Sequence, residues 1–390
     1  MKVAIVAPLV SAIREPQGGG SQAFVSDLAR GLAGRGHEVA VFAATGSDIP
    51  GVTVIDTGVD PRSLLATLYR ASGSASSRGD DPPSTPRREA SSAFRISPRG
   101  DVRDQDAAAS AFAGVYARVR QTRYDVVHNH AFDAPAIGLA SALGAPVVHT
   151  LHLPPDAAIA AALRDAARGP RAPAVAGVSA FQASAWSRVV RVDAILPPYV
   201  PTRAIPWSQA AGEGAVFAGR LSPEKGAAEA IDIARAAGVA IDVYGDAYDA
   251  QYAREQIGPR RGLPGVTVHG GVARRSLWPA MSRAAVVLCP ARWDEPFGMA
   301  AAEAQACGTP VVAFRRGGLG EMIADGVTGF LVTPDDLRAA AESVRKVTGI
   351  SRSACRGHAE RHLDLERSLD AHEQLYERVV SAFAGTAADG

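Results

Sequence analysis

The sequence predicts an α/β protein of two Rossmann-like domains, each built on a parallel sheet and facing the other across a cleft. Short runs of β-branched and apolar residues alternate with helical patterns along most of the 390 residues. Such alternation is typical of a parallel sheet with helices on both faces. A proline-rich connector at residues 196–207 interrupts the pattern, which then restarts. This length is enough for two domains, each with its own core.

The first domain is expected at residues 1–198. The run KVAIVAP predicts a first buried strand, and SQAFVSDLARGLAGRG has apolar residues at helical spacing followed by a closing glycine. Further β-branched runs predict the remaining strands. The strands expected in this domain cover residues 2–8, 37–44, 124–130, 146–152, 174–179 and 193–198.

The second domain is expected at residues 199–363, because stiff prolines in the preceding connector do not suit a central strand. A helix is predicted from Pro223, and helices are predicted from about residue 351 to the end. The final helix, at residues 364–390, should pack through its apolar positions. The strands expected here cover residues 214–220, 240–246, 265–271, 284–290, 309–314 and 329–332.

Composition narrows the class of protein. The net charge of +1 gives no reason to expect nucleic acid or an anionic membrane as partner. Three cysteines without a CxxC pair favour a reducing compartment, so a cytoplasmic location is expected. The apolar opening is short enough for a first strand rather than a leader, and the sequence has no apolar run of the ~18 residues that a membrane span requires.

Residues 71–106 break the alternating pattern. This stretch is rich in Ser, Pro, Arg and Asp and has few aliphatic residues, so it predicts a mobile insertion. It contains an Asp-x-Asp pair, Asp104 and Asp106. A metal-binding pair of this kind should end a buried strand, and we therefore interpret it as part of a solvated linker.

The stretch AGRLSPEKG, residues 218–226, predicts an anion site. A strand ends near Arg220, and Ser222 and Pro223 have the character of a helix N-cap and first position. Lys225 would lie in the first turn. Free N–H groups, the helix dipole and two cations would meet there, which suits a diphosphate. The alternative is a surface ion pair beside a capped helix.

The stretch DEPFGMAAAE places Glu295 and Glu303 eight positions apart around a predicted helix start. With a helix beginning at Pro296, the N–H groups of residues 297–299 would point outward between the two carboxylates. Hydroxyl-binding groups at both ends and amides in the middle match a nucleotide-sugar, which has a ribose, a diphosphate and a sugar. The alternative is two solvated helix glutamates, although Glu303 has apolar neighbours in the sequence.

These motifs resemble the retaining family 4 glycosyltransferases, which have the GT-B fold. In the second half, the resemblance lies in GRLSPEKG, VHGGV, EPFGMAAAE and GGLGEMIADGVTGFLV; in the first half, it lies in GGGSQAFVSDLARGLAGRGHEVAV, DVVHNHAFDAP and PVVHTLH. It extends over almost all of the chain except the insertion. Two departures are LPPYVP in place of an Asn-Gly turn before the connector, and Gly320 in place of a proline in the Gly-Gly-x-Pro-Glu loop.

The resemblance implies roles for individual residues. Arg220 and Lys225 would bind the donor diphosphate, Glu303 the ribose and Glu295 the sugar, while His152 would face the reacting centre. The set implied as catalytic is therefore His152, Arg220, Lys225 and Glu295. The further donor-binding residues would be Gly19, Gly20, Gly219, Gly270, Gly271, Val272, Phe297, Gly298 and Met299. The resemblance also implies that the last helix packs back across the first domain.

Three further motifs allow alternative interpretations. The glycines of GGGSQ follow the first strand at too great a distance for a dinucleotide fingerprint. His128, His130, His149 and His152 could bind zinc, but we favour polar residues lining an acceptor pocket, with His128, His130 and His149 on the acceptor side. The basic segment at residues 273–284 could lie on a membrane, but a packed helix with solvated arginines is favoured.

The function expected is sugar transfer with retention, from a nucleoside-diphosphate sugar, UDP rather than GDP, to a small soluble acceptor such as a natural product or polyol. We expect no metal, no cofactor and no association with a membrane. The alternatives are a nucleotide-sugar 2-epimerase on the same fold and a non-catalytic nucleotide-sugar binding protein. The sequence leaves open the sugar and the base of the donor, the identity of the acceptor, the linkage, the oligomeric state and the role of the insertion at residues 71–106.

Overall fold

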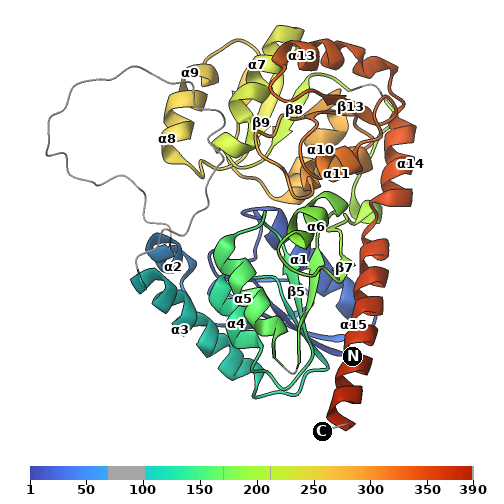
Figure 1. Cartoon of the computed structure of the whole chain (residues 1–390). Helices are drawn as coiled ribbons and strands as arrows, with labels where there is room; N and C mark the ends of the chain where they lie inside the picture. The colour runs from blue at the N-terminus through green and yellow to red at the C-terminus, as the bar shows by residue number, and fades with distance from the viewer. Residues whose placement is uncertain (69–101, 170, 211, 389–390) are drawn as a thin grey trace, which may run out of the picture.

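The computed structural model describes residues 1–68, 102–169, 171–210 and 212–388. It contains two parallel sheets, each in its own domain, and one domain lies above the other in the view of Figure 1. The first domain carries a seven-stranded sheet in the order β3-β2-β1-β4-β5-β6-β7, and the second carries a six-stranded sheet in the order β10-β9-β8-β11-β12-β13. The predicted fold class is therefore confirmed: two Rossmann-like α/β domains face each other.

The strands of the first sheet follow the predicted apolar runs, because their residues are buried on both faces. The edge strand β3 was missed by the sequence analysis: its burial is only partial, so it lacks the continuous apolar run of a central strand. The strands are β1 (Lys2–Val6), β2 (Glu38–Ala43), β3 (Thr53–Asp56), β4 (Val126–Asn129), β5 (Val147–Leu151), β6 (Ala174–Gly177) and β7 (Ala194–Ile195).

Helices cover both faces of this sheet, and the first residue of α1 lies next to the second domain. It begins at Gly20, directly after the glycine-rich end of a long first loop. The helices of the first domain are α1 (Gly20–Gly34), α2 (Pro61–Leu68), α3 (Val102–Val119), α4 (Ala134–Ala140), α5 (Ala157–Ala167) and α6 (Ala180–Ser187).

The second sheet repeats the same design. Its strands are β8 (Ala215–Ala218), β9 (Ile241–Tyr244), β10 (Val266–Val268), β11 (Val286–Cys289), β12 (Val311–Phe314) and β13 (Gly329–Val332). The principal helices are α7 (Ala227–Ala237), α10 (Arg274–Arg283), α11 (Met299–Ala306), α13 (Leu337–Lys346) and α14 (Arg352–His362), with short turns at α8 (Ala250–Tyr252), α9 (Gly258–Arg261) and α12 (Leu319–Met322).

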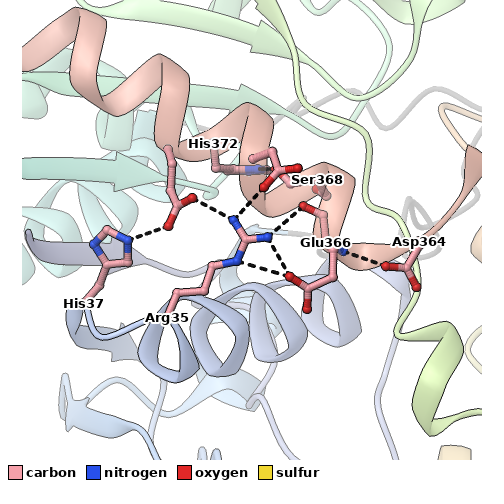
Figure 2. Close-up of polar contacts among 8 residues, drawn as sticks. Arg35, His37, Asp364, Glu366, Ser368 and His372 are labelled. Atoms are coloured by element: carbon pink, nitrogen blue, oxygen red, sulfur yellow. Dashed lines mark hydrogen bonds and ion pairs between the residues drawn. The ribbon is translucent and has the colours of Figure 1, made fainter.

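The last helix, α15 (Leu365–Ala388), leaves the second domain and runs along the first (Figure 1). Leu369 packs close to Gly31 of α1, and Leu375 and Tyr376 enter the core of the first domain. At the end of α1, Arg35 makes ion pairs with carboxylates of α15 (Figure 2). The predicted packing of the last helix on the first domain is confirmed, and it places α15 against α1.

The predicted insertion falls on residues 71–106, of which 71–101 lie outside the described residues. Residues 102–106 are helical and belong to α3, so the expectation of an unstructured linker is wrong for this end of the segment. The Asp104 and Asp106 pair accordingly lies on a helix rather than at a strand end. None of the helices in the described part of the chain has the length and apolar character needed to cross a bilayer.

Candidate functional site

A cleft of about 1510 Å³ lies between the two domains, and both contribute to its walls. The cleft lies at the carboxyl ends of the strands, which is where open parallel sheets bind their ligands. The first domain contributes Gly19, Gly20 and His152. The second contributes the remaining predicted residues that line it, which are Gly219, Arg220, Lys225, Gly271, Val272, Glu295, Phe297, Gly298, Met299 and Glu303.

The loop after β8 places two cations in the cleft. Residues Pro223–Lys225 form a 3₁₀ turn, and α7 begins only after Gly226, which has a φ of 75°. The predicted helix start at Pro223 is therefore a separate turn. A Cβ at Gly226 would lie 2.1 Å from the carbonyl oxygen of Pro290, so only glycine fits this approach to the end of β11.

The buried carboxylate of Glu224 orients Arg220. Its Oε1 accepts hydrogen bonds from Nη2 of Arg220 at 3.2 Å and from the hydroxyl of Ser222 at 2.7 Å. The guanidinium of Arg220 also lies 4.4 Å from the ring centroid of Tyr248, a cation–π contact. Arg220 is thus held on two sides, while it remains partly open to the cleft.

Lys225 and Glu295 form an ion pair at the same end of the cleft. Nζ of Lys225 lies 2.9 Å from Oε1 and 2.6 Å from Oε2 of Glu295. The indole N–H of Trp293 donates to Oε2 of Glu295 at 2.9 Å, and Nζ of Lys225 lies 5.2 Å from the Trp293 ring. A group that competes for the ammonium, such as a phosphate, would leave the carboxylate held by the indole.

Helix α11 begins at Met299 and not at Pro296, which corrects the predicted start. Gly298 is its N-cap residue with a φ of 108°, and a Cβ there would lie 2.6 Å from Leu319. The first N–H groups of a helix have no intrahelical partner, so this end of α11 offers donors to the cleft. A Cβ at Gly20 would lie 3.2 Å from the sulfur of Met299, which shows how closely α1 and α11 approach across the cleft.

Glu303 is buried and paired, as its apolar sequence neighbours required. Its Oε1 accepts hydrogen bonds from Nε of Arg274 at 2.7 Å and from the indole N–H of Trp278 at 3.2 Å. Nη1 of Arg274 continues to Asp27 of α1 at 2.7 Å. The prediction of solvated arginines at residues 273–284 is wrong for Arg274, which is buried on the cleft-facing side of α10.

The loops after β9 and β10 form the end of the cleft next to Arg220, which contacts Tyr248 in the loop after β9. The backbone N–H of Gly271 donates to Oδ1 of Asp246 at 2.7 Å, which fixes the two loops against each other. Tyr244 lines this end and stacks on His269 with ring centroids 4.4 Å apart. Gly271 and Val272 therefore line the cleft wall next to Asp246, while Gly270 precedes them in the same loop.

Three of the four predicted histidines lie behind the cleft wall, which corrects the prediction that they line an acceptor pocket. His128, His130 and His149 are fully buried, because they project from the central strands β4 and β5 and their ends into the core. His128 bonds to Tyr376 of α15 at 2.6 Å. Nδ1 of His130 lies 2.9 Å from Nε2 of His152, which is the histidine that reaches the cleft.

Burial keeps these imidazoles neutral. It lowers the pKa of His149 to about 3, and burial with a contribution from His372 lowers the pKa of His152 to about 4. The pKa values of His128 and His130 are also well below the ordinary value for the same reason. In the part of the chain that the structure describes, no group of three or more His, Cys, Asp or Glu side chains is arranged to hold a metal ion.

Two family models match the chain and divide it at the connector. Residues 18–202 match the model described as Glycosyltransferase Family 4, and residues 211–354 match the model described as Glycosyl transferases group 1. Together they account for most of the sequence. The chain is a family 4 glycosyltransferase with the GT-B fold.

Relatives and solved structures agree with this assignment. A D-inositol 3-phosphate glycosyltransferase of Saccharomonospora viridis is 28% identical over 99% of this chain and 96% of its own. AviGT4, a glycosyltransferase involved in avilamycin A biosynthesis, matches with a TM-score of 0.66 at 21% identity over 98% of both chains. Anabaena HepE in complex with UDP and glucose matches with a TM-score of 0.68 at 20% identity over 98% of this chain and 100% of its own.

Several residues that position the predicted ones were not predicted as part of the site. Trp293 lies two positions before Glu295, and its aromatic side chain next to a charged motif was a usable signal. Arg274 was seen and assigned to solvent. Tyr248 and Asp27 carried no local signal, because their contacts join segments far apart in the sequence.

Proposed function

We propose that the protein transfers a sugar from a nucleoside-diphosphate sugar, with UDP as the nucleotide, to a small hydroxyl-bearing acceptor. The observation that carries the proposal is the convergence of Arg220, Lys225 and the first N–H groups of α11 at the carboxyl end of the second sheet. Two fixed cations and a helix N-terminus match the charge and geometry of a diphosphate. UDP is favoured over GDP, in line with the UDP-bound complex of HepE, which shares this fold.

The carboxylates at the two ends of the cleft suit the hydroxyls of the donor. Glu303 would bind the ribose through the oxygen not engaged by Arg274 and Trp278. Glu295 would orient the sugar once a phosphate oxygen competes for Lys225, because the Trp293 indole still holds its Oε2. Residues 297–299 and the glycines of α1 would lie along the diphosphate and sugar between them.

The reaction we propose proceeds with retention. The bond from the anomeric carbon to the phosphate oxygen breaks, and the acceptor oxygen bonds to the same face of that carbon. The acceptor proton passes to the departing phosphate. This assignment is favoured because the described carboxylates on the cleft wall have other partners: Asp246 holds Gly271, Asp249 holds Tyr252, and Glu295 and Glu303 are ion-paired.

Arg220, Lys225 and the helix N–H groups would stabilise the negative charge that develops on the leaving diphosphate. We propose that they do so without a metal ion, since two fixed cations already supply charge at this position. His152 would lie beside the reacting sugar as a neutral imidazole, because burial lowers its pKa to about 4. Closure of the two domains would exclude water, as transfer rather than hydrolysis requires.

The acceptor we propose is a small polyol or a natural product. The first-domain wall combines neutral polar side chains, Ser11, Gln17 and Gln22, with apolar Phe132 and Leu153. Oε1 of Gln17 is buried without a hydrogen-bond partner among the described residues, so a hydroxyl could donate to it. The named acceptor chemistry of the Saccharomonospora viridis relative, an inositol phosphate, belongs to the same broad class of small polyols.

The test is a transfer assay with UDP-glucose and UDP-N-acetylglucosamine against a panel of inositols, sugar phosphates and aglycones, in the presence of EDTA. The proposal predicts release of UDP that depends on one acceptor, with the product's anomeric configuration by NMR equal to that of the donor. Interconversion of the sugar nucleotide without any acceptor would instead identify a 2-epimerase. Tight binding with neither reaction would identify a non-catalytic binding protein.

A further inference from the structure

A buried chain of charges links the two walls of the cleft. Arg274 of the second domain donates from Nε to Glu303 and from Nη1 to Asp27 of α1, each at 2.7 Å. Its backbone N–H donates to Oε2 of Glu15, on the first loop, at 3.1 Å. One residue therefore contacts Glu303, the carboxylate proposed to bind the ribose, and two carboxylates of the opposite domain.

The burial of these groups depends on the approach of the domains. The side chains of Arg274, Asp27 and Glu303 are only 10%, 7% and 7% exposed. A buried charge is costly unless it is paired, and here the carboxylates of Asp27 and Glu303 both contact the Arg274 guanidinium. Burial raises the pKa of Asp27 in spite of the opposing effect of Arg274, which shows how strongly this carboxylate is desolvated.

The guanidinium also fixes the orientation of Glu303. Arg274 and Trp278 both donate to Oε1, so the position of this oxygen is set from two sides. Nη2 of Arg274 is buried and has no hydrogen-bond partner among the described residues, and Arg274 lines the cleft. The arrangement thus leaves one nitrogen of the Arg274 guanidinium available for a further partner beside Glu303.

We propose that Arg274 is a positioning residue that couples recognition of the donor's ribose at Glu303 to closure of the domains through Asp27. The inference rests on the proposed function, since it requires a ribose in this part of the cleft. Because coupling is reciprocal, ribose hydroxyls that favour this orientation of Glu303 also favour the Asp27–Arg274 contact. Closure on a complete nucleotide would then be preferred to closure on an empty site.

A second link between the domains provides a matched control. The carboxylate of Glu321 in α12 accepts hydrogen bonds from the backbone N–H groups of Ala180 and Phe181 at the start of α6, at 2.9 Å and 2.6 Å. This link also spans the two domains but does not contact Glu303. Loss of Glu321 should therefore weaken closure equally for all nucleotides. Loss of Asp27 should instead lower the part of the nucleotide affinity that depends on the ribose hydroxyls.

The experiment compares the affinities of UDP and 2′,3′-dideoxy-UDP by calorimetry, with GDP and its dideoxy form as substitutes if UDP does not bind. The test variant is Asp27→Asn, because it leaves the neutral Arg274–Glu303 pair intact within the second domain. The control variant is Glu321→Gln. Asp27→Glu restores the charge and provides the conservative rescue.

We expect Asp27→Asn to lower the ratio of the UDP affinity to the dideoxy-UDP affinity at least fivefold and to reduce kcat. Glu321→Gln should leave this ratio unchanged, and Asp27→Glu should recover part of it. Typical coupling energies correspond to about 5- to 150-fold. An unchanged ratio in Asp27→Asn, with UDP bound as in the unaltered protein, would overturn this inference and leave the proposed function standing. Failure of UDP and GDP to bind the unaltered protein would overturn both.

Discussion

The two walls of the cleft are built differently. On the second domain, charged side chains from two short motifs, GRLSPEKG and WDEPFGMAAAE, lie side by side and pair with one another. On the first domain, the wall consists of glycines at the start of α1 and neutral side chains from distant loops, backed by buried histidines. The wall of the second domain thus carries fixed charge in contiguous sequence, and the wall of the first domain carries a shape that is assembled by the fold.

The largest effect is expected from the two cations on the wall of the second domain. Arg220→Ala or Lys225→Ala should lower kcat about 10²- to 10³-fold, because removal of one donor that stabilises developing charge typically costs ~2.7–4 kcal/mol. Steady-state kinetics with the best donor and acceptor would measure it. Arg338→Ala, which removes an exposed arginine of α13 paired with Glu342, is the control and should change kcat less than twofold. Equal effects of all three variants would contradict a specific diphosphate site.

Glu295→Gln should lower kcat about 10- to 100-fold while the affinity for free UDP changes little. The reason is that Glu295 is assigned to the sugar, and hydrogen bonds to charged groups contribute about 1.5–3 kcal/mol. Trp293→Phe should act in the same direction with a smaller effect, because it removes the indole N–H that holds Oε2. Calorimetry with UDP and kinetics with the UDP-sugar separate the two quantities. A loss of UDP affinity without a loss of kcat would remove the sugar-orienting role.

The wall of the first domain should be sensitive to the size of the side chains on it. Gly20→Val should lower kcat about fivefold or more, because even the Cβ would lie 3.2 Å from the Met299 sulfur and the branched side chain would hold the domains apart. Gly18→Val is the matched variant, since a Cβ at Gly18 has no heavy atom within 4 Å. Kinetic constants of the two variants give the comparison. A larger effect at Gly18 than at Gly20 would argue against close contact between α1 and α11.

The smallest effect is expected on the pH dependence of stability. Buried His149, with a pKa near 3, stays neutral when folded but takes up a proton when unfolded below pH ~6.5, so the free energy of unfolding should fall as the pH falls. Between pH 7 and 5.5 this one group should cost about 1 kcal/mol. Urea unfolding of the unaltered protein and of His149→Gln at both pH values would measure it. The same pH dependence in both proteins would show that His149 is accessible to protons in the folded state.

The comparison also explains what the sequence could predict. Strands such as β1 and β11 and the groups Arg220, Lys225, Glu295 and Glu303 were found because periodicity and short motifs are local properties. The start of α11 was misplaced because Gly298 adopts a left-handed conformation that ends the loop only at Met299. Arg274 was assigned to solvent because its partners, Asp27 and Glu303, are brought together by the two domains. The histidines were assigned to the cleft because sequence does not show which strand residues face the core.

The central claim is that the cleft binds a nucleoside diphosphate through Arg220 and Lys225. The most direct measurement is a thermal-shift panel of nucleoside diphosphates and their sugar derivatives in EDTA, on the unaltered protein and on the Arg220→Ala and Lys225→Ala variants. The account predicts a clear rise in melting temperature with UDP and a UDP-sugar, retained in EDTA and lost in both variants. Absence of a shift with every nucleotide, or an equal shift in the two variants, would contradict it.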